Sequence, residues 1–212
     1  MSIIKMQNIT KKFGNKIILN KFSLDIKEGE LLAITGLSGS GKSTILNIIG
    51  LLEDIDSGKF ILDGNENIKV NSSKANKILR ETIGYLFQNF ALIDEETVLY
   101  NLQLALKYVK KSKSEKKDLI KHALKHMNLE NYEKRKIYEL SGGEQQRVSI
   151  ARLILKPSKI ILADEPTGSL DAKNRDLVLF HLKELNKQGK TVIIVTHDIE
   201  VAQKCNRIIS LN

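Results

Sequence analysis

The sequence predicts an α/β fold with a mostly parallel sheet, an antiparallel β subdomain at the N-terminus and an inserted α-helical subdomain. Two β-rich stretches, Ile3–Ile9 and Ile17–Ile26, lie on either side of a turn at Gly14-Asn15 and indicate the antiparallel part. Short apolar runs that alternate with helix-length segments indicate the parallel sheet. Apolar residues at helical spacing between residues 89 and 139 indicate the inserted helices.

The length of 212 residues suits one domain and leaves no room for a second of full size. We therefore expect a single domain over 1–212, with a core at about 1–88 and 158–212 and a helical subdomain at 89–157. No apolar run approaches the ~20 residues that cross a bilayer. The N-terminus lacks the layout of a signal peptide, so the chain is expected to stay in the cytoplasm.

The individual elements follow from local patterns. Leu31–Thr35 has the pattern of a short buried strand that runs into glycines, and the helix-length segment Ser43–Leu52 follows it. Further short strands are predicted at Gly58–Gly64 and Tyr85–Gln88. The last part of the chain alternates in the same way, with strand Lys159–Ala163, helix Lys173–Gln188, strand Thr191–Thr196, a short helix from Asp198 and strand Arg207–Leu211.

The charge of the chain is strongly positive. Lysine and arginine number 34 against 25 aspartates and glutamates, a formal net charge of +9. Such a charge favours polyanions, which include nucleotide phosphates, nucleic acid and an acidic membrane surface. Lysines are dense over residues 107–125, where a solvated face and a specific anion-binding surface both remain open. The single cysteine, Cys205, has no partner for an internal disulfide and is expected to pack near the last strand.

A glycine-rich loop between the predicted strand Leu31–Thr35 and the following helix is the strongest signal in the sequence. It satisfies the phosphate-loop pattern with Gly36-Leu37-Ser38-Gly39-Ser40-Gly41-Lys42-Ser43-Thr44. Glycines allow successive N–H groups to point at phosphate oxygens, and the helix presents its positive end. Lys42 should reach the β- and γ-phosphates, Ser43 should place its hydroxyl on Mg²⁺, and Thr44 should assist at the α-phosphate. The fold class is thus a P-loop NTPase core.

Two carboxylates, Asp164 and Glu165, follow the apolar strand Lys159–Ala163. The strand carries them to the carboxyl edge of the parallel sheet, where ligands of open α/β folds bind. Asp164 is the natural partner of Mg²⁺ through water, and Glu165 is free to polarise an attacking water. Alone, an apolar run that ends in two acids would mean little; together with the phosphate loop it indicates nucleotide hydrolysis.

The segment Leu140–Arg147 reads LSGGEQQR, and we call it the signature segment. Ser141 and Glu144, three residues apart, predict a capping box at the start of a helix. Capping does not explain Gly142 and Gly143, since glycine at a helix start costs up to about 1 kcal/mol relative to alanine. Small residues beside free N–H groups suit the close approach of a phosphate.

The order of these motifs resembles that of the ATP-binding-cassette (ABC) transporter ATPases over essentially the whole chain. The shared series is the phosphate loop, Gln88, the signature segment, the Asp164-Glu165 pair, Ser169-Leu170-Asp171, and His197 after a strand. The resemblance implies ATP and Mg²⁺ as cofactors. It also implies a second copy of the chain as partner, paired head to tail so that each ATP lies between one phosphate loop and the other copy's signature segment.

Residue roles follow from the same resemblance. Ser141 and Gly143, with Gly142 between them, would contact the γ-phosphate held by the other copy. Gln88 would sense Mg²⁺ and water and link to the membrane partner, and Asp171 would bridge the two sites.

Two further roles leave alternatives open. His197 would contact the γ-phosphate, or would serve only to cap the next helix. Phe13 matches the aromatic residue that stacks on adenine, although tyrosine is commoner there, and strand packing is the alternative.

Within the family, the phosphate loop with Leu46–Leu52 and the segment Ala163–Asp171 are similar to ATPases of the lipoprotein-release and macrolide-efflux group. Phe87–Leu102 is similar to bacteriocin-export subunits. We therefore expect an exporter ATPase that energises a separate integral membrane permease and lies on the inner face of the cell membrane. The end of the chain at Asn212, with no appended regulatory domain, also favours export.

Two rival functions are considered. An ABC ATPase of the signalling or cell-division type would use the same ATP chemistry on a membrane partner without moving cargo. A nucleic-acid-associated ABC ATPase is supported only by the charge of +9, and the sequence contains no recognised nucleic-acid module. We expect no nucleic-acid partner.

Overall fold

The computed structural model describes residues 1–168 and 170–211, without the side chains of residues 172 and 173. Its N-terminal part is a four-stranded antiparallel sheet in the order β2-β1-β4-β5. The strands are β1 (Ser2–Phe13), β2 (Lys16–Lys27), β4 (Ser57–Leu62) and β5 (Asn65–Glu66). β1 and β2 form a hairpin that places Phe13 opposite Lys16 at its tip. The turn needs Gly14, whose φ of 56° is unfavourable for residues with a Cβ.

The second sheet has five strands in the order β6-β7-β8-β3-β9. They are β3 (Leu31–Gly36), β6 (Ile83–Leu86), β7 (Ile160–Asp164), β8 (Thr191–Val195) and β9 (Arg207–Leu211). Every neighbouring pair in this sheet is parallel. The carboxyl ends of β3, β8 and β7 therefore lie side by side at one edge, and the loops that follow them meet there.

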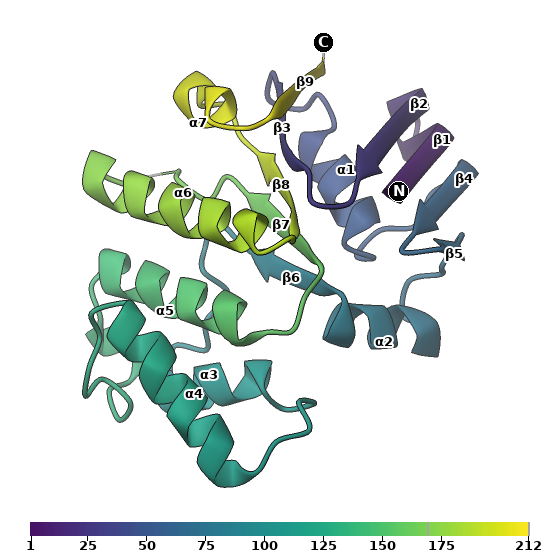
Figure 1. The fold of residues 1–212 in the computed structure, drawn as a ribbon. Helices are drawn as coiled ribbons and strands as arrows, with labels where there is room; N and C mark the ends of the chain where they lie inside the picture. The colour runs from purple at the N-terminus through teal and green to yellow at the C-terminus, as the bar shows by residue number, and fades with distance from the viewer. Residues whose placement is uncertain (169, 212) are drawn as a thin grey trace.

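Side chains on the two faces of this sheet belong to two separate hydrophobic clusters. In β8, Val192 and Ile194 pack in one cluster, whereas Ile193 and Val195 pack in the other. This is the alternation expected of a strand buried on both faces. α1 (Lys42–Ile49) and the antiparallel sheet cover one face, and α5 (Gly142–Leu155) and α6 (Ala172–Lys187) cover the other (Figure 1).

The helical part of the chain packs on α5. It contains α3 (Val98–Ala105), α4 (Lys113–His126) and a 3₁₀ turn at Ile137–Glu139, and both α3 and α4 lie against α5 (Figure 1). α7 (Ile199–Gln203) follows β8. The α/β fold with an antiparallel sheet, a parallel sheet and a helical part is thus confirmed. The division at residues 88/89 and 157/158 stays a prediction.

The structure differs from the sequence-based expectation at three places. α2 (Ser73–Glu81) was not predicted, because only Ala75 and Ile78 of its nine residues are buried and the apolar pattern is weak. The two-residue strand β5 was missed as well. β6 ends at Leu86 and not at Gln88, so Gln88 lies in the loop beyond the sheet. No helix among the described residues is long and apolar enough to cross a membrane.

Candidate functional site: a phosphate loop and a signature segment in separate cavities

The phosphate loop connects β3 to α1 and requires glycine at two positions. Gly36 has a φ of 146° and a Cβ there would collide with the carbonyl oxygen of Leu211. Gly41 has a φ of 96° and a Cβ would come within 3.1 Å of Ile18 and Leu19 on β2. Only glycine lets the backbone make this turn so close to two strands.

Lys42 is buried, and its ammonium group sits inside the loop. Its Nζ donates hydrogen bonds to the carbonyl oxygens of Gly36 and Leu37, both at 2.8 Å. The Ser40 hydroxyl is buried and has no hydrogen-bond partner among the described residues. A cationic loop with an unpaired buried hydroxyl fits the binding of an anion, because a phosphate oxygen would satisfy both groups.

Ser43 and Asp164 form the part of the site that suits a divalent cation. The Ser43 hydroxyl donates to Oδ1 of Asp164 at 3.5 Å, although Ser43 lies in the first turn of α1 and Asp164 at the end of β7. Burial raises the pKa of the Asp164 carboxyl and the charge of Glu165 adds to this, while Ser43 and Lys42 oppose it. A hydroxyl and a carboxylate beside a phosphate loop are oxygen ligands of the kind that Mg²⁺ takes.

Glu165 and His197 are in direct contact. Nδ1 of His197 lies 2.9 Å from Oε1 of Glu165, and the His197 N–H donates to Oε2 at 3.4 Å. Glu165 follows β7 and His197 follows the neighbouring strand β8. The order of the strands therefore brings the two residues together although they are 32 positions apart in the sequence. Glu165 has a left-handed φ of 44°, an unfavourable conformation of the kind that clusters at active sites. The pair can hold a carboxylate in one orientation beside the loop.

These residues line one cavity of about 440 Å³, which we call the phosphate-loop cavity. Its lining contains most of the predicted nucleotide-binding residues, namely Phe13, Ser38, Gly39, Gly41, Lys42, Ser43, Thr44, Glu165 and His197. Phe13 is 49% exposed at the tip of the hairpin, with Nζ of Lys11 5.1 Å from its ring centre. Lys16 also lines the cavity and was not predicted. Its role could have been predicted from the sequence, because a hairpin with its turn at Gly14 pairs Lys16 with Phe13.

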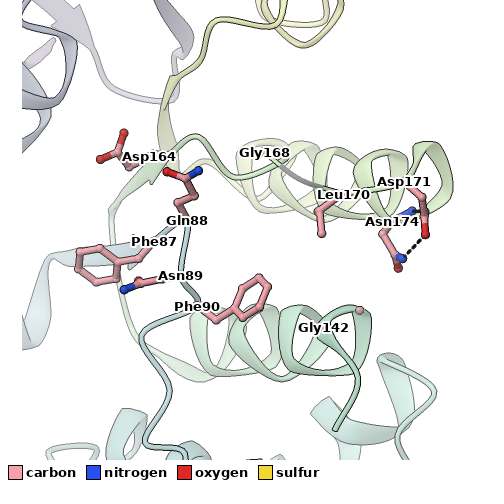
Figure 2. Close-up of a pocket in the computed structure, with 11 residues that line it drawn as sticks. Phe87, Gln88, Asn89, Phe90, Gly142, Asp164, Gly168, Leu170, Asp171 and Asn174 are labelled. Atoms are coloured by element: carbon pink, nitrogen blue, oxygen red, sulfur yellow. Dashed lines mark hydrogen bonds between the residues drawn. The ribbon is translucent and has the colours of Figure 1, made fainter. Parts of the chain in front are cut away.

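A second cavity of about 600 Å³, the signature cavity, contains several more of the predicted residues (Figure 2), whereas Gly36, Ser40 and Ser141 line neither cavity. Gln88, Gly142, Gly143, Asp164 and Asp171 line it. Figure 2 shows the Gln88 amide pointing toward the segment with Asp164 and Gly168, and a Cβ on Gly168 would lie 3.3 Å from Nε2 of Gln88. Within one chain, the signature glycines therefore line a different cavity from Lys42 and Glu165.

Asp171 and Asn174 begin α6 beside the signature cavity. The Asp171 side chain accepts hydrogen bonds from the backbone N–H of Asn174 at 2.8 Å and from its Nδ2 at 2.9 Å (Figure 2). Asn174 was not predicted, since its contact with Gly143 on α5 depends on how two helices pack. Ser169, between Gly168 and Leu170 in the predicted motif, lies outside the described residues.

The signature segment forms the capping box that the spacing predicts. Ser141 Oγ accepts from the N–H of Glu144 at 3.4 Å, and Glu144 Oε2 accepts from the N–H of Ser141 at 2.8 Å. The Tyr132 hydroxyl donates to Glu144 Oε1 at 2.7 Å. This hydrogen bond, with those from Ser141, lowers the pKa of Glu144 to about 2.

The two glycines of the signature segment differ. A Cβ on Gly143 would lie 3.1 Å from Nδ2 of Asn174, whereas a Cβ on Gly142 would meet nothing within 4 Å in the part of the chain that the structure describes. Packing inside the chain thus accounts for the small residue at 143 and not for the one at 142. The space at Gly142 is open to a group from outside the chain.

Comparison with known proteins agrees with this geometry. The family model described as ABC transporter matches residues 19–168. The macrolide export ATP-binding/permease protein MacB of Mannheimia succiniciproducens is 41% identical over 100% of this chain, but the chain spans only 33% of its length. The uncharacterized ABC transporter ATP-binding protein MJ0796 of Methanocaldococcus jannaschii is 44% identical over 99% of this chain and 93% of its own.

Solved structures give the same result. A dimeric structure of a post-hydrolysis state of the ATP-binding cassette MJ0796, bound to ADP and Pi, superposes with a TM-score of 0.88. It is 42% identical, and the match covers 99% of this chain and 94% of that one. This chain matches only a third of the length of the MacB proteins, so the match does not show that it has their full activity. The family match, the identity and the shared fold together establish that this chain belongs to the ABC transporter family as an ATPase domain.

Proposed function

We propose that the chain binds and hydrolyses ATP with Mg²⁺ and that this reaction drives an export permease. The observation that carries the proposal is the meeting of Lys42, Glu165 and His197 in one cavity beside a glycine-rich phosphate loop. Hydrolysis of a nucleoside triphosphate needs a cationic loop that binds the phosphates and a carboxylate held beside that loop.

Binding is assigned to the phosphate-loop cavity. The adenine ring stacks on the exposed ring of Phe13, and the phosphates lie in the loop over the N-terminus of α1. Lys42 exchanges its bonds to the loop carbonyls for bonds to the β- and γ-phosphates. Ser40 gains the partner that its hydroxyl lacks among the described residues.

Ser43 and Asp164 would hold Mg²⁺, with Gln88 nearby. Ser43 and Asp164 already share a hydrogen bond, and Asp164 lines the same cavity as Gln88. When bound, the ion supplies positive charge to the phosphate oxygens and to the oxygen that leaves with ADP. Its charge also favours the ionised form of Asp164, which burial alone disfavours.

Hydrolysis is assigned to Glu165. Its carboxylate accepts a proton from the water that attacks the γ-phosphorus, as the bond from that phosphorus to the β-phosphate oxygen breaks and ADP leaves. His197 holds Glu165 through Nδ1 and its backbone N–H, which fixes the carboxylate in one orientation. His197 also lines the cavity, where the γ-phosphate would contact both His197 and Glu165.

A second copy of the chain completes the site. The signature glycines do not line the phosphate-loop cavity of their own chain, and Gly142 is open to an outside group. We therefore assign Ser141, Gly142 and Gly143 to the nucleotide held by the other copy, in a head-to-tail pair with Asp171 near the contact. The dimeric form of the MJ0796 cassette supports this arrangement.

The export permease is inferred from the relatives. Several proteins that match over nearly the whole chain are macrolide export ATP-binding/permease proteins. We assign the chain to the inner face of the cell membrane, held there by a permease of the export type. Co-purification with an importer permease and a substrate-binding protein would contradict the export assignment.

The proposal is tested by ATP hydrolysis and light scattering on the purified chain and on Glu165→Gln. We expect the variant to form an ATP-dependent dimer and to lose about 10²- to 10⁴-fold in turnover, the usual worth of a general base. Glu200→Gln is the matched control, because Glu200 is an exposed carboxylate that pairs with Arg175 and does not line the cavity. Unchanged turnover in Glu165→Gln would remove Glu165 from the role of base.

A further inference from the structure

The segment after Gln88 has an unfavourable backbone conformation. Phe90 and Ala91, two consecutive residues with side chains, have left-handed φ angles of 60° and 48°. Single residues other than glycine adopt this conformation uncommonly, and two in succession need to be held by their surroundings. The local backbone bonds, from Phe90 to Phe87 at 3.1 Å and from Ala91 to Asn89 at 2.6 Å, tighten the turn.

Arg152 on α5 holds this turn. Its Nη1 donates to the carbonyl oxygen of Ala91 at 2.5 Å and its Nη2 donates to that of Phe90 at 2.6 Å. The guanidinium is a rigid fork, so the two bonds fix both carbonyls at once. Among the described residues Arg152 takes part in no ion pair, although burial of its guanidinium lowers its pKa. The clamp on the two carbonyls is therefore the main use of this half-buried charge.

A second side chain fixes the end of the same segment. Asn101 on α3 is fully buried; its Oδ1 accepts from the N–H of Ile93 at 2.8 Å and its Nδ2 donates to the Ile93 carbonyl at 3.2 Å. Residues 90–93 are thus tied to two helices of the helical part. Gln88, two residues before the Phe90–Ala91 turn, points the other way, toward Asp164 (Figure 2).

Arg152 lies on α5, the helix that begins in the signature segment, so the clamp connects that segment to the turn after Gln88. α5 begins at Gly142 in the signature segment and ends at Leu155, and Figure 2 shows Phe90 lying alongside it. One helix therefore carries a signature glycine at its start and the clamp near its end. A displacement at the start of a rigid helix is carried to its end, and the fork transmits it to the turn next to Gln88.

We propose that Arg152 is a positioning residue that couples the signature segment to Gln88. The inference rests on the proposed function, since it concerns the Mg²⁺ and water that Gln88 is assigned to sense. Arg152 does not touch the reacting atoms. Arg152 fixes the position of Gln88, and through α5 this position depends on what binds at Gly142.

The test compares Arg152→Lys and Arg152→Gln with the wild-type chain. Lysine keeps the charge and glutamine removes it, and neither can hold both carbonyls with the geometry of the fork. Hydrogen exchange at the amides of Phe90 and Ala91 should quicken about tenfold, without a change at the amides of β7 or α1. The control is Arg80→Lys, since Arg80 lies 4.5 Å from the Tyr108 ring and, among the described residues, the side-chain hydrogen bonds to the Phe90 and Ala91 carbonyls come from Arg152.

Kinetics give the second readout. Both variants should lose about tenfold to a hundredfold in kcat and need more Mg²⁺ for half-maximal rate, because Gln88 is displaced. Nucleotide affinity of the monomer should stay within about twofold of wild type, since Phe13 and the phosphate loop are untouched. A merely structural role would lower the melting temperature without a change in Mg²⁺ dependence.

A double variant sharpens the test. Ala91→Gly removes the Cβ that makes φ 48° unfavourable, so it should restore kcat to about a third of wild type in the Arg152→Lys background. Unchanged exchange at Phe90 and Ala91 in both Arg152 variants would overturn the inference, and so would an unchanged Mg²⁺ requirement in an active enzyme. Absence of hydrolysis in the wild-type chain would instead refute the proposed function, and the exchange measurement would still decide on the clamp.

Discussion

The starts of α1 and α5 are two helix N-termini that both contain glycines, and they are built differently. α1 begins after Gly41, which is left-handed, and no side chain of the described residues caps it. α5 begins after Ser141, which caps it in a capping box with Glu144. The free N–H groups of the first helix are left for a ligand from solution, whereas those of the second are partly used by its own chain.

The glycines differ in the same sense. Gly41 is required by Ile18 and Leu19 of its own chain, whereas a Cβ on Gly142 would meet none of the described residues within 4 Å. The phosphate loop is therefore a site that one chain completes, and the signature segment is a surface shaped for something outside the chain. Variants of the phosphate loop should change how a single chain binds nucleotide, and variants at Gly142 should change how two chains pair.

The largest effect is expected for Lys42→Ala. Charge-assisted hydrogen bonds contribute about 1.5–3 kcal/mol, so the nucleotide affinity of the monomer should fall about tenfold to 150-fold. Isothermal titration of the monomer with ATP measures it. Lys16→Ala is the control, because Lys16 lines the same cavity outside the loop and should have a much smaller effect. Equal losses in the two variants would mean that general positive charge, and not the loop, binds the phosphates.

Phe13→Ala is expected to have a somewhat smaller effect on the same measurement. Stacking of a base on an aromatic ring contributes about 1–3 kcal/mol, or about fivefold to 150-fold in affinity. Phe13→Tyr keeps the ring and should bind as wild type does. If Phe13→Ala binds ATP normally and only melts earlier, the ring belongs to strand packing, the alternative that its half-exposed position leaves open.

Gly142→Ala separates the two regions. The monomer should bind ADP as wild type does and should melt no earlier, since alanine favours a helix by up to about 1 kcal/mol over glycine. The ATP-dependent dimer of Glu165→Gln should weaken about tenfold when Gly142→Ala is added, because a methyl group occupies space meant for a phosphate. Analytical ultracentrifugation measures this. A dimer of unchanged strength would mean that Gly142 does not face the other copy.

The smallest effect concerns the cap of α5 and its dependence on pH. Glu144 has a pKa lowered from 4.5 to about 2, so its contribution to stability is present above pH 4.5 and is lost as the pH falls toward 2. Tyr132→Phe removes the largest cause of this shift, the hydrogen bond from the Tyr132 hydroxyl, and should lower the melting temperature at pH 7 slightly.

The control for that prediction is the pH series itself. The difference between wild type and Tyr132→Phe should shrink as the pH falls from 4.5 to 2, because protonation of Glu144 removes the charge that strengthens the bond. A difference that stays constant over this range would show that Tyr132 acts through packing alone.

Local features of the molecule could be predicted from the sequence because they depend on spacing along the chain. The capping box at Ser141 and Glu144 needs only residues three apart, and the structure contains both of its hydrogen bonds. The phosphate loop needs only a strand, a run of glycines and a helix. The family, the α/β fold and the strand ends that carry Asp164 and His197 followed from the same local patterns.

Tertiary structure alone decided which of these residues meet. The contact of Glu165 with His197 depends on β8 lying between β3 and β7, and the clamp of Arg152 on Phe90 and Ala91 joins residues 61 and 62 positions apart. Asn174 lines the signature cavity for the same reason. Spacing along the chain determines hydrogen bonds within one turn, whereas contacts between strand ends and between helices depend on packing of side chains from distant segments, which no single window of sequence contains.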